Sequence, residues 1–239
     1  MTNQSGYSMN SNIPKFFQAL HYWPAYLLLK AVYRFEIQGQ ENLKGLEKGP
    51  IIFASNHASG AIDPPLCPIS LPRNGFYPKD FFPVRFIAKK DVLANWRSRL
   101  PFFLSIFWLP ISFFSDLFVK MAGSIYVTKG AGLEKNLENA VSALEEESKL
   151  WIYPEGRVTL DGNTGPGRPG VFYLHQKTKA PIIPVGLSGT YKGLYPQNLI
   201  KGLLGLKKIK VKFGKPIYSL GDDEEKGVEK VMEEIGKLL

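Results

Sequence analysis

From Pro50 to Ser55 the chain reads PIIFAS, an apolar run that lies between Gly49 and the polar pair Asn56-His57. An apolar run of this length, bounded by a turn residue on one side and polar residues on the other, is typical of a buried strand. We therefore predict a buried strand over residues 50–55, and we expect the histidine to lie where that strand ends.

Strand-like and helix-like stretches alternate on the C-terminal side of this run. Residues 133–149 carry apolar side chains at helical spacing, and a final helix-like stretch, which Asp222 or Asp223 is expected to cap, closes the chain. This alternation predicts an α/β fold: a single domain with a mixed, largely parallel sheet flanked by helices. The further strand-like runs are residues 86–88, 124–127, 150–153, 181–185 and 209–213.

The composition excludes several classes of protein and site. The 239 residues are 44% hydrophobic and 21% charged, a balance that suits a folded globular chain and excludes wholesale disorder. Cys67 is the single cysteine, and the three histidines are His21, His57 and His175. These counts argue against a disulfide framework and against a cysteine-rich or histidine-rich metal centre. We therefore predict neither a metal site nor a cofactor.

Positive charge is concentrated in one part of the sequence. The formal net charge is +9, and residues 162–221 contain ten Lys or Arg residues and no Asp or Glu. Such a stretch predicts contact with phosphates on a membrane, a nucleotide or a nucleic acid, although a solvated basic face has the same composition. Because no zinc-finger, helix-turn-helix or RNA-recognition signature accompanies the charge, we do not expect nucleic acid as a partner.

Two aromatic-rich stretches fall short of the ~20 apolar residues that a transmembrane helix needs. Residues 16–35 are interrupted by a proline and by charged residues, and residues 100–115 are uncharged but contain two prolines. We predict that both lie in a membrane interface, and a pair of buried core helices is the alternative. The predicted organisation is an N-terminal membrane-interface segment at residues 1–35 and one domain at residues 36–239, which includes an aromatic membrane-contact insertion at residues 97–120.

A histidine and a carboxylate follow the first predicted strand. The imidazole of His57 could take a proton from an attacking hydroxyl while the carboxylate of Asp63 fixes the tautomer of the ring. Six residues apart on a regular helix, the two side chains would lie on different faces, so the chain must turn between them, and Ser59-Gly60 permits a turn. Asp63 before Pro64 is also a natural helix N-cap, a structural role that is compatible with orienting His57.

A second polar group follows the predicted strand at residues 150–153. The sequence there is Pro154-Glu155-Gly156-Arg157, and the exits of strands are where α/β proteins place ligands. A guanidinium can hold a phosphate through two parallel hydrogen bonds, and glycine lets the backbone approach closely. The alternative is an ordinary turn with a surface arginine.

Five short segments between residues 56 and 185 carry a resemblance. They are NH…DP at residues 56–64, FIAK at 86–89, GSIYV at 123–127, YPEGR at 153–157 and PIIPV at 181–185. In this order they resemble the glycerolphosphate and 1-acyl-glycerol-3-phosphate (lysophosphatidate) acyltransferase superfamily of phospholipid biosynthesis. KFGKPI at residues 212–217 resembles the closing strand of that superfamily.

The resemblance implies transfer of a fatty acyl group from acyl-CoA or acyl carrier protein to a hydroxyl of a glycerophospholipid precursor. The expected acceptor is lysophosphatidate, which gives phosphatidate. It also implies a peripheral or monotopic protein on the cytoplasmic face of a membrane, with an anionic membrane surface as partner. His57 and Asp63 would be the catalytic pair, and the substrate-binding residues would be Glu155, Gly156, Arg157, Lys89, Lys129 and Arg168.

Two departures from the pattern of the superfamily leave alternatives open. Five residues separate His57 from Asp63, whereas four is the common spacing, and the longer spacing resembles that of a minority that includes glycerol-3-phosphate acyltransferases. Lys129 stands where arginine is usual, which keeps the charge but loses the planar fork. The acceptor could therefore be glycerol 3-phosphate or another lysolipid or amino-lipid. A non-enzymatic peripheral lipid-binding protein is the alternative from another class.

Overall fold

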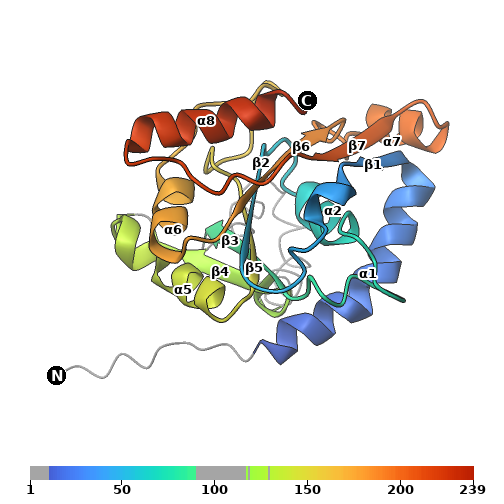
Figure 1. Ribbon diagram of the computed structural model, residues 1–239. Helices are drawn as coiled ribbons and strands as arrows, with labels where there is room; N and C mark the ends of the chain where they lie inside the picture. The colour runs from blue at the N-terminus through green and yellow to red at the C-terminus, as the bar shows by residue number, and fades with distance from the viewer. Residues whose placement is uncertain (1–10, 90–116, 118, 129) are drawn as a thin grey trace, which may run out of the picture.

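Helices and strands alternate along the chain in the computed structural model, which describes residues 11–89, 117, 119–128 and 130–239 (Figure 1). The described strands are β1 (Arg34–Gln38), β2 (Ile51–Ser55), β3 (Val84–Lys89), β4 (Ser124–Val127), β5 (Lys149–Ile152), β6 (Ile182–Ser188) and β7 (Lys208–Phe213). The described helices are α1 (Asn12–Val32), the short 3₁₀ helix η1 (Gln40–Leu43), α2 (Asp63–Ile69), α5 (Leu133–Glu145), α6 (Gly170–Thr178), α7 (Pro196–Leu203) and α8 (Glu224–Gly236).

The strands form one mixed sheet in the order β1-β7-β6-β2-β5-β3-β4. The five strands from β6 to β4 are parallel to one another, while β7 runs antiparallel to β6 and β1 runs parallel to β7. The prediction of a mixed, largely parallel sheet flanked by helices is therefore confirmed. Because β6, β2 and β5 are parallel neighbours, their carboxyl ends lie at the same edge of the sheet, where open α/β sheets bind ligands.

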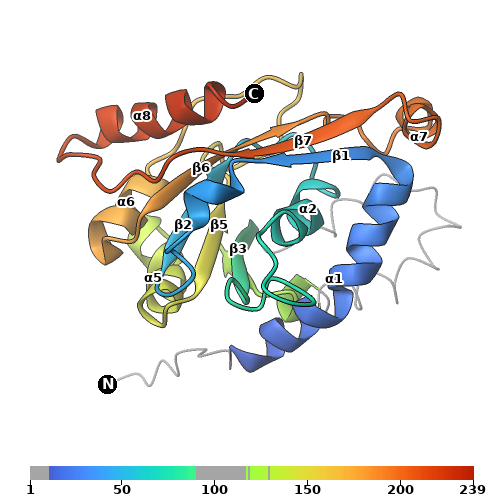
Figure 2. The ribbon, with the colours of Figure 1, turned by 45° about the vertical axis from the view of Figure 1, so that its right-hand side comes forward.

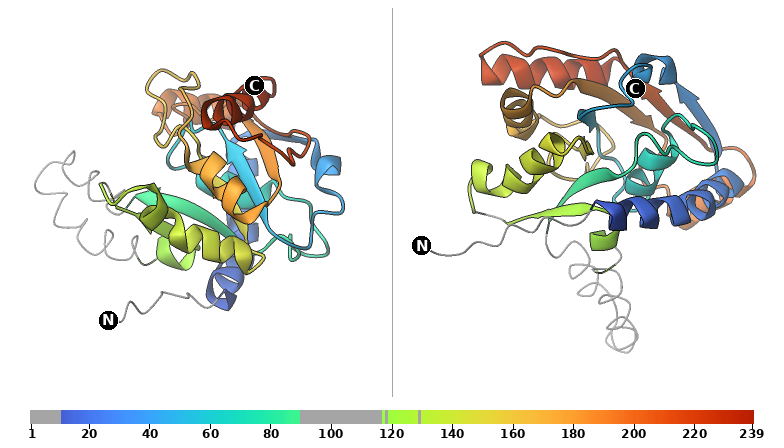
Figure 3. Two further views of the ribbon diagram at one scale, coloured as in Figure 1. Left: turned by 60° about the vertical axis from the view of Figure 1, so that its left-hand side comes forward. Right: turned by 60° about the horizontal axis from the view of Figure 1, so that its bottom comes forward.

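Helices cover both faces of the sheet. Alternate residues of β2 point to opposite faces: Phe53 packs in the cluster with α1 and α2, and Ile52 packs in the cluster with α5, α6 and α8. Figure 2 shows these two groups of helices on opposite sides of the strands, and Figure 3 shows α1 and α8 on opposite sides from two further directions. Since neither face of β2 meets water, all five of its residues are buried, which explains the unbroken apolar run PIIFAS.

The sequence located the inner strands and the final helix but missed one edge strand. The strand-like runs correspond to β3, β4, β5, β6 and β7, and Asp223 caps α8 by accepting a hydrogen bond from the backbone N–H of Lys226 at 3.1 Å. No strand was predicted at β1. It is a half-buried edge strand that carries Glu36, which forms an ion pair with Lys208 of β7, so its sequence lacks the apolar run that marked the inner strands.

Helix α1 has an inner and an outer side, both largely apolar. Its inner side buries Phe17 and Tyr22 against the core, and the Gln18 amide exchanges hydrogen bonds with the backbone of Val84. Its outer side exposes Ile13, Phe16, Leu20, Leu27 and Leu28, each between 48% and 69% accessible. The alternative of a buried core helix therefore describes only the inner side of α1, and the outer side is exposed.

Among the residues that the structure describes, no helix combines the length and the apolar character that crossing a bilayer requires. The predicted N-terminal segment at residues 1–35 corresponds, in its described part, to α1 and the start of β1. The predicted aromatic insertion at residues 97–120 lies outside the described residues, apart from residues 117, 119 and 120. The membrane roles of both segments stay predictions.

Candidate active site

The loops after β2 and β5 meet at the carboxyl edge of the sheet. β2 and β5 are parallel neighbours, with Ala54 paired to Ile152, so the residues that follow each strand emerge side by side. The backbone N–H of Thr159 donates a hydrogen bond to the carbonyl of His57 at 2.8 Å, which joins the two loops beyond the sheet. The two motifs that the sequence singled out therefore form one site.

His57 and Asp63 are in direct contact. Nδ1 of His57 lies 2.9 Å from Oδ2 of Asp63; the carboxylate is fully buried, while the imidazole keeps 13% of its surface exposed. The carboxylate can only accept, so Nδ1 donates and Nε2 carries the free lone pair. Nε2 makes no hydrogen bond within the described part of the chain. The geometry leaves a partly exposed imidazole whose orientation is fixed through Nδ1 by Asp63.

A turn between the two residues makes this contact possible. The Ser59 hydroxyl accepts a hydrogen bond from the backbone N–H of Ile62 at 3.2 Å, and the Ser59 carbonyl accepts one from the N–H of Asp63. Oδ2 of Asp63 also accepts hydrogen bonds from the backbone N–H groups of Ala58 and Ser59 at 2.8 and 2.7 Å. Asp63 is the first residue of α2 and does not cap that helix, so the predicted N-cap was wrong. Its carboxylate turns back to hold the loop.

Glu155 connects the β5 loop to the histidine from the other side. The side chain is 4% exposed, and Oε1 accepts a hydrogen bond from the backbone N–H of His57 at 3.1 Å. Oε2 accepts one from the N–H of Gly165 at 2.9 Å. Both carboxylate oxygens thus bond to backbone groups of the protein, a positioning role that the sequence did not predict. Direct contact of Glu155 with a substrate stays a prediction.

Tyr153 forms the floor beneath the imidazole. Its ring stacks on that of His57 with a centroid distance of 3.8 Å and an angle of 11° between planes, and its hydroxyl shares a hydrogen bond of 3.5 Å with Sγ of Cys67. Burial raises the pKa of both the Tyr153 phenol and the Cys67 thiol well above their usual values. The two groups therefore stay protonated, and Cys67 is a packing residue, not a thiolate nucleophile. The sequence placed Tyr153 in the motif but gave no signal of the stacking.

Asn56, next to the histidine, links its loop to the neighbouring strand. Its side-chain amide donates to the carbonyl of Leu187 at 2.9 Å and accepts from the N–H of Leu187 at 2.8 Å. Leu187 belongs to β6, so this reciprocal pair of hydrogen bonds continues the ladder after the β2–β6 backbone pairing ends at Ser55. The residue before His57 is fixed to the sheet as firmly as a strand residue.

Arg157, Gly156 and Arg168 occupy the outer part of the site. Arg157 is exposed and makes no hydrogen bond or ion pair with the described residues. Nε of Arg168 donates to the Glu155 carbonyl at 3.2 Å, and its side chain lies so close to Gly156 that a β-carbon there would come within 2.8 Å of it. Gly156 also has a φ of 65°, a conformation that favours glycine. Gly156 thus allows the Arg168 side chain to approach the loop that holds Glu155.

The remaining predicted residues are less well placed. Lys89 ends β3, and its side chain is not among the described atoms; Lys129 lies outside the described residues. Nδ1 of His175 donates a hydrogen bond to the carbonyl of Ala180 in the core, 2.9 Å away, and the residue takes no part in the site. In the described part of the chain, no group of three or more His, Cys, Asp or Glu residues could hold a metal ion.

Comparison with known proteins identifies the family. Residues 34–188 match the family model described as Acyltransferase, which covers more than half of the chain. The chain belongs to the acyltransferase family. In this acyltransferase the matched region begins at β1 and ends with β6, so it contains the whole His57, Asp63 and Glu155 cluster.

Several individual proteins are similar to this acyltransferase over part of their length. It is 32% identical over 82 residues to a chloroplastic 1-acyl-sn-glycerol-3-phosphate acyltransferase of Brassica napus, covering 34% of this chain and 23% of that protein. It is 26% identical over 174 residues to a putative 1-acyl-sn-glycerol-3-phosphate acyltransferase of Caenorhabditis elegans, covering 71% of this chain and 52% of that protein. The chain thus spans about half or less of the length of these relatives.

One solved structure supports the fold. The crystal structure of the 1-acyl-sn-glycerophosphate acyltransferase of Thermotoga maritima aligns with a TM-score of 0.55 at 16% identity, over 95% of this chain and 77% of that chain. At this identity the likeness concerns the fold. It agrees with the mixed sheet flanked by helices described above.

Proposed function

We propose that this protein transfers a fatty acyl group from an acyl thioester to the free hydroxyl of lysophosphatidate, giving phosphatidate. The observation that carries the proposal is the 2.9 Å contact between Nδ1 of a partly exposed His57 ring and the buried carboxylate of Asp63. Family membership and the names of the relatives support acyl transfer to a 1-acyl-glycerol 3-phosphate. Either acyl-CoA or acyl carrier protein would serve as the donor.

The proposed reaction is a direct transfer with general-base catalysis. Nε2 of His57 takes the proton of the acceptor hydroxyl while that oxygen forms a bond to the thioester carbonyl carbon. The tetrahedral intermediate then breaks its carbon–sulfur bond, and the leaving thiolate takes the proton from the imidazolium. Asp63 keeps Nδ1 protonated and stabilises the positive ring between the two steps.

The other site residues divide into positioning and binding roles in this proposal. Glu155 holds His57 through a hydrogen bond from its backbone N–H, and Tyr153 holds the imidazole by stacking on its ring face. Arg157, with Arg168 beside it and Lys89 and Lys129 as further cations, binds the acceptor phosphate. An exposed guanidinium without an internal partner is suited to a bidentate contact with phosphate.

We also propose attachment to the cytoplasmic surface of a membrane through α1. Its inner side packs on the core while its outer row of large apolar side chains remains exposed. A row of exposed large apolar side chains marks a surface that meets a partner or a lipid, and an interfacial position would cover this row with lipid. An anionic surface would also attract a chain with a net charge of +9.

The test is acyl transfer by purified protein with His57→Ala as the key variant. Loss of the general base should lower kcat by about 10²- to 10⁴-fold, whereas circular dichroism and vesicle binding should be unchanged, since the ring is partly exposed. Products from lysophosphatidate, glycerol 3-phosphate and other lysolipids, each offered with acyl-CoA and acyl carrier protein donors, are identified by mass. Turnover retained by His57→Ala, or thiol release that does not depend on any acceptor, would contradict the proposal.

A further inference from the structure

Helix α7 and its flanking residues present an exposed apolar face. Ile200, Leu203 and Leu204 are spaced i, i+3 and i+4, so they lie on one side of the helix. On the other side Gly202 packs against Val32 and Tyr33, where a β-carbon would come within 2.5 Å of the Val32 carbonyl oxygen. The α7 face, as we name it, consists of Leu194, Tyr195, Ile200, Leu203, Leu204 and Leu206, which are 48–74% exposed.

The density of apolar side chains on the α7 face indicates an interaction site. Six of the thirteen residues from Leu194 to Leu206 are large, apolar and exposed. Single exposed apolar residues are ordinary on protein surfaces, whereas a contiguous group marks a surface that meets a partner or a lipid. The fold does not require these side chains, because Leu199 and Gly202 already provide the packing of α7 against the core.

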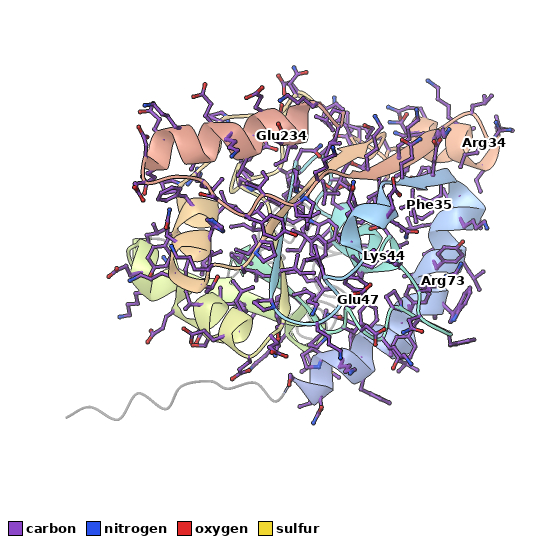
Figure 4. The ribbon with its side chains drawn as sticks, viewed as in Figure 1. Arg34, Phe35, Lys44, Glu47, Arg73 and Glu234 are labelled. Carbon is purple, nitrogen blue, oxygen red and sulfur yellow. The ribbon has the colours of Figure 1, made fainter. Side chains whose placement is uncertain are left out.

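Cations lie around the α7 face, and their charge favours an anionic partner. Lys201 and Lys207 lie close together, and burial, followed by the charge of Lys201, lowers the pKa of Lys207. Nζ of Lys192 lies 5.0 Å from the ring centroid of Tyr191. Figure 4 shows Arg34 at this end of the molecule, and its Nε lies beside Gly205 of the turn that follows α7. Lysines and tyrosines around leucines are typical of the headgroup region of an anionic bilayer.

The α7 face is physically connected to the active site. The Tyr191 hydroxyl donates to the carbonyl of Leu160 at 2.6 Å, one residue after Thr159, which bonds to His57. Gly193 packs directly on Ile62 of the loop that holds Asp63. Because β6 ends at Ser188 at the carboxyl edge of the sheet, residues 189–195, which lead into α7, lie beside the loops that form the site.

The α7 face also adjoins α1. Figures 1 and 2 both show α7 at the C-terminal end of α1, and the Tyr33 hydroxyl donates to the carbonyl of Gly193 at 2.9 Å. We propose that the α7 face inserts into the headgroup region of an anionic bilayer, as a second contact beside α1, and holds the mouth of the active site against the lipid. The advantage of this membrane contact rests on the proposed function, since a lysolipid acceptor could then reach His57 without leaving the membrane surface.

The test compares Leu203→Glu/Leu204→Glu with two single variants: Leu203→Glu, and Leu133→Glu as the control, in which an exposed leucine at the start of α5 receives the same charge as Leu203→Glu. Binding to vesicles of phosphatidylcholine with and without phosphatidylglycerol is measured by cosedimentation. We expect the wild type and the control to bind the anionic vesicles. The double variant should bind at least tenfold more weakly, and its thermal unfolding should be unchanged because both positions are exposed.

Activity provides the second readout. The double variant should turn over a water-soluble short-chain acceptor at the wild-type rate, and a long-chain acceptor embedded in anionic vesicles at least tenfold more slowly. Wild-type vesicle binding by the double variant would overturn the inference. So would light scattering showing that the wild type is a dimer that the double variant converts to monomer, which would make the face an interface between copies. If no acyl transfer occurs in the wild type, the proposed function fails while the vesicle-binding result still decides the α7 face.

Discussion

The active-site loops and the α7 face meet at one edge of the sheet, but they differ in which kind of side chain they bury and which they expose. The loops bury polar groups, and the carboxylates of Asp63 and Glu155 between them accept five hydrogen bonds, four of them from backbone N–H groups. The α7 face exposes apolar side chains. The first region bonds these carboxylates to groups of the chain itself, whereas the second has its apolar side chains in water.

This difference teaches how each region should respond to substitution. Removing a partner inside a buried hydrogen-bond network costs about 1–3 kcal/mol and displaces whatever the network holds. Changing an exposed leucine leaves the fold intact and alters only what the surface contacts. Changes to the buried hydrogen-bond network of the loops should therefore lower kcat with every form of substrate, while changes on the α7 face should matter only where lipid is present.

The largest effect on kcat should come from Asp63→Asn in the active-site loops. The amide keeps one acceptor oxygen but loses the negative charge that stabilises the protonated imidazole, so kcat should fall about 10²- to 10⁴-fold with a soluble acceptor. Steady-state kinetics with the short-chain acceptor measures the effect, and vesicle binding should be unchanged. A kcat within threefold of the wild type would show that His57 does not depend on Asp63.

A smaller effect is expected from Glu155→Gln. The glutamine amide would place an NH₂ group opposite the backbone N–H of either His57 or Gly165, at a cost of about 1–3 kcal/mol, and shift the backbone of the base. We expect kcat to fall about 10- to 100-fold with the KM for the acceptor unchanged. The control is Glu229→Gln on the exposed side of α8. A rise in KM at constant kcat would instead place Glu155 against the acceptor.

The smallest effect should follow Arg157→Ala. Arg157 is exposed and has no partner in the described part of the chain, so its loss should leave the loops intact and remove only a contact with the acceptor phosphate. At saturating thioester, the KM for the acceptor should rise about tenfold while kcat changes little. The control is Lys215→Ala, another exposed cation. If the KM for the thioester rises instead, Arg157 belongs to the donor site.

The sequence predicted those parts of the fold and site in which a residue's neighbours in the chain determine its surroundings. The run PIIFAS was recognisable because both faces of β2 are buried. The pairing of His57 with Asp63 was expected from the family resemblance, and Ser59-Gly60 permits the turn that it requires. Contacts between distant segments left no local signal. The stacking of Tyr153 on His57 and the bond from Glu155 to the His57 backbone each join residues about 100 positions apart.

Asn56 has a consequence for how the protein would work at a surface. Its amide forms two hydrogen bonds with the backbone of Leu187, which tie the residue preceding His57 to the strand that leads to α7. If α7 settles at a given depth among lipid headgroups, the height of the imidazole above the acyl chains is fixed by the same two hydrogen bonds. The distance between α7 and His57, which the sheet sets, would then determine which atoms of a membrane-embedded acceptor the imidazole can reach.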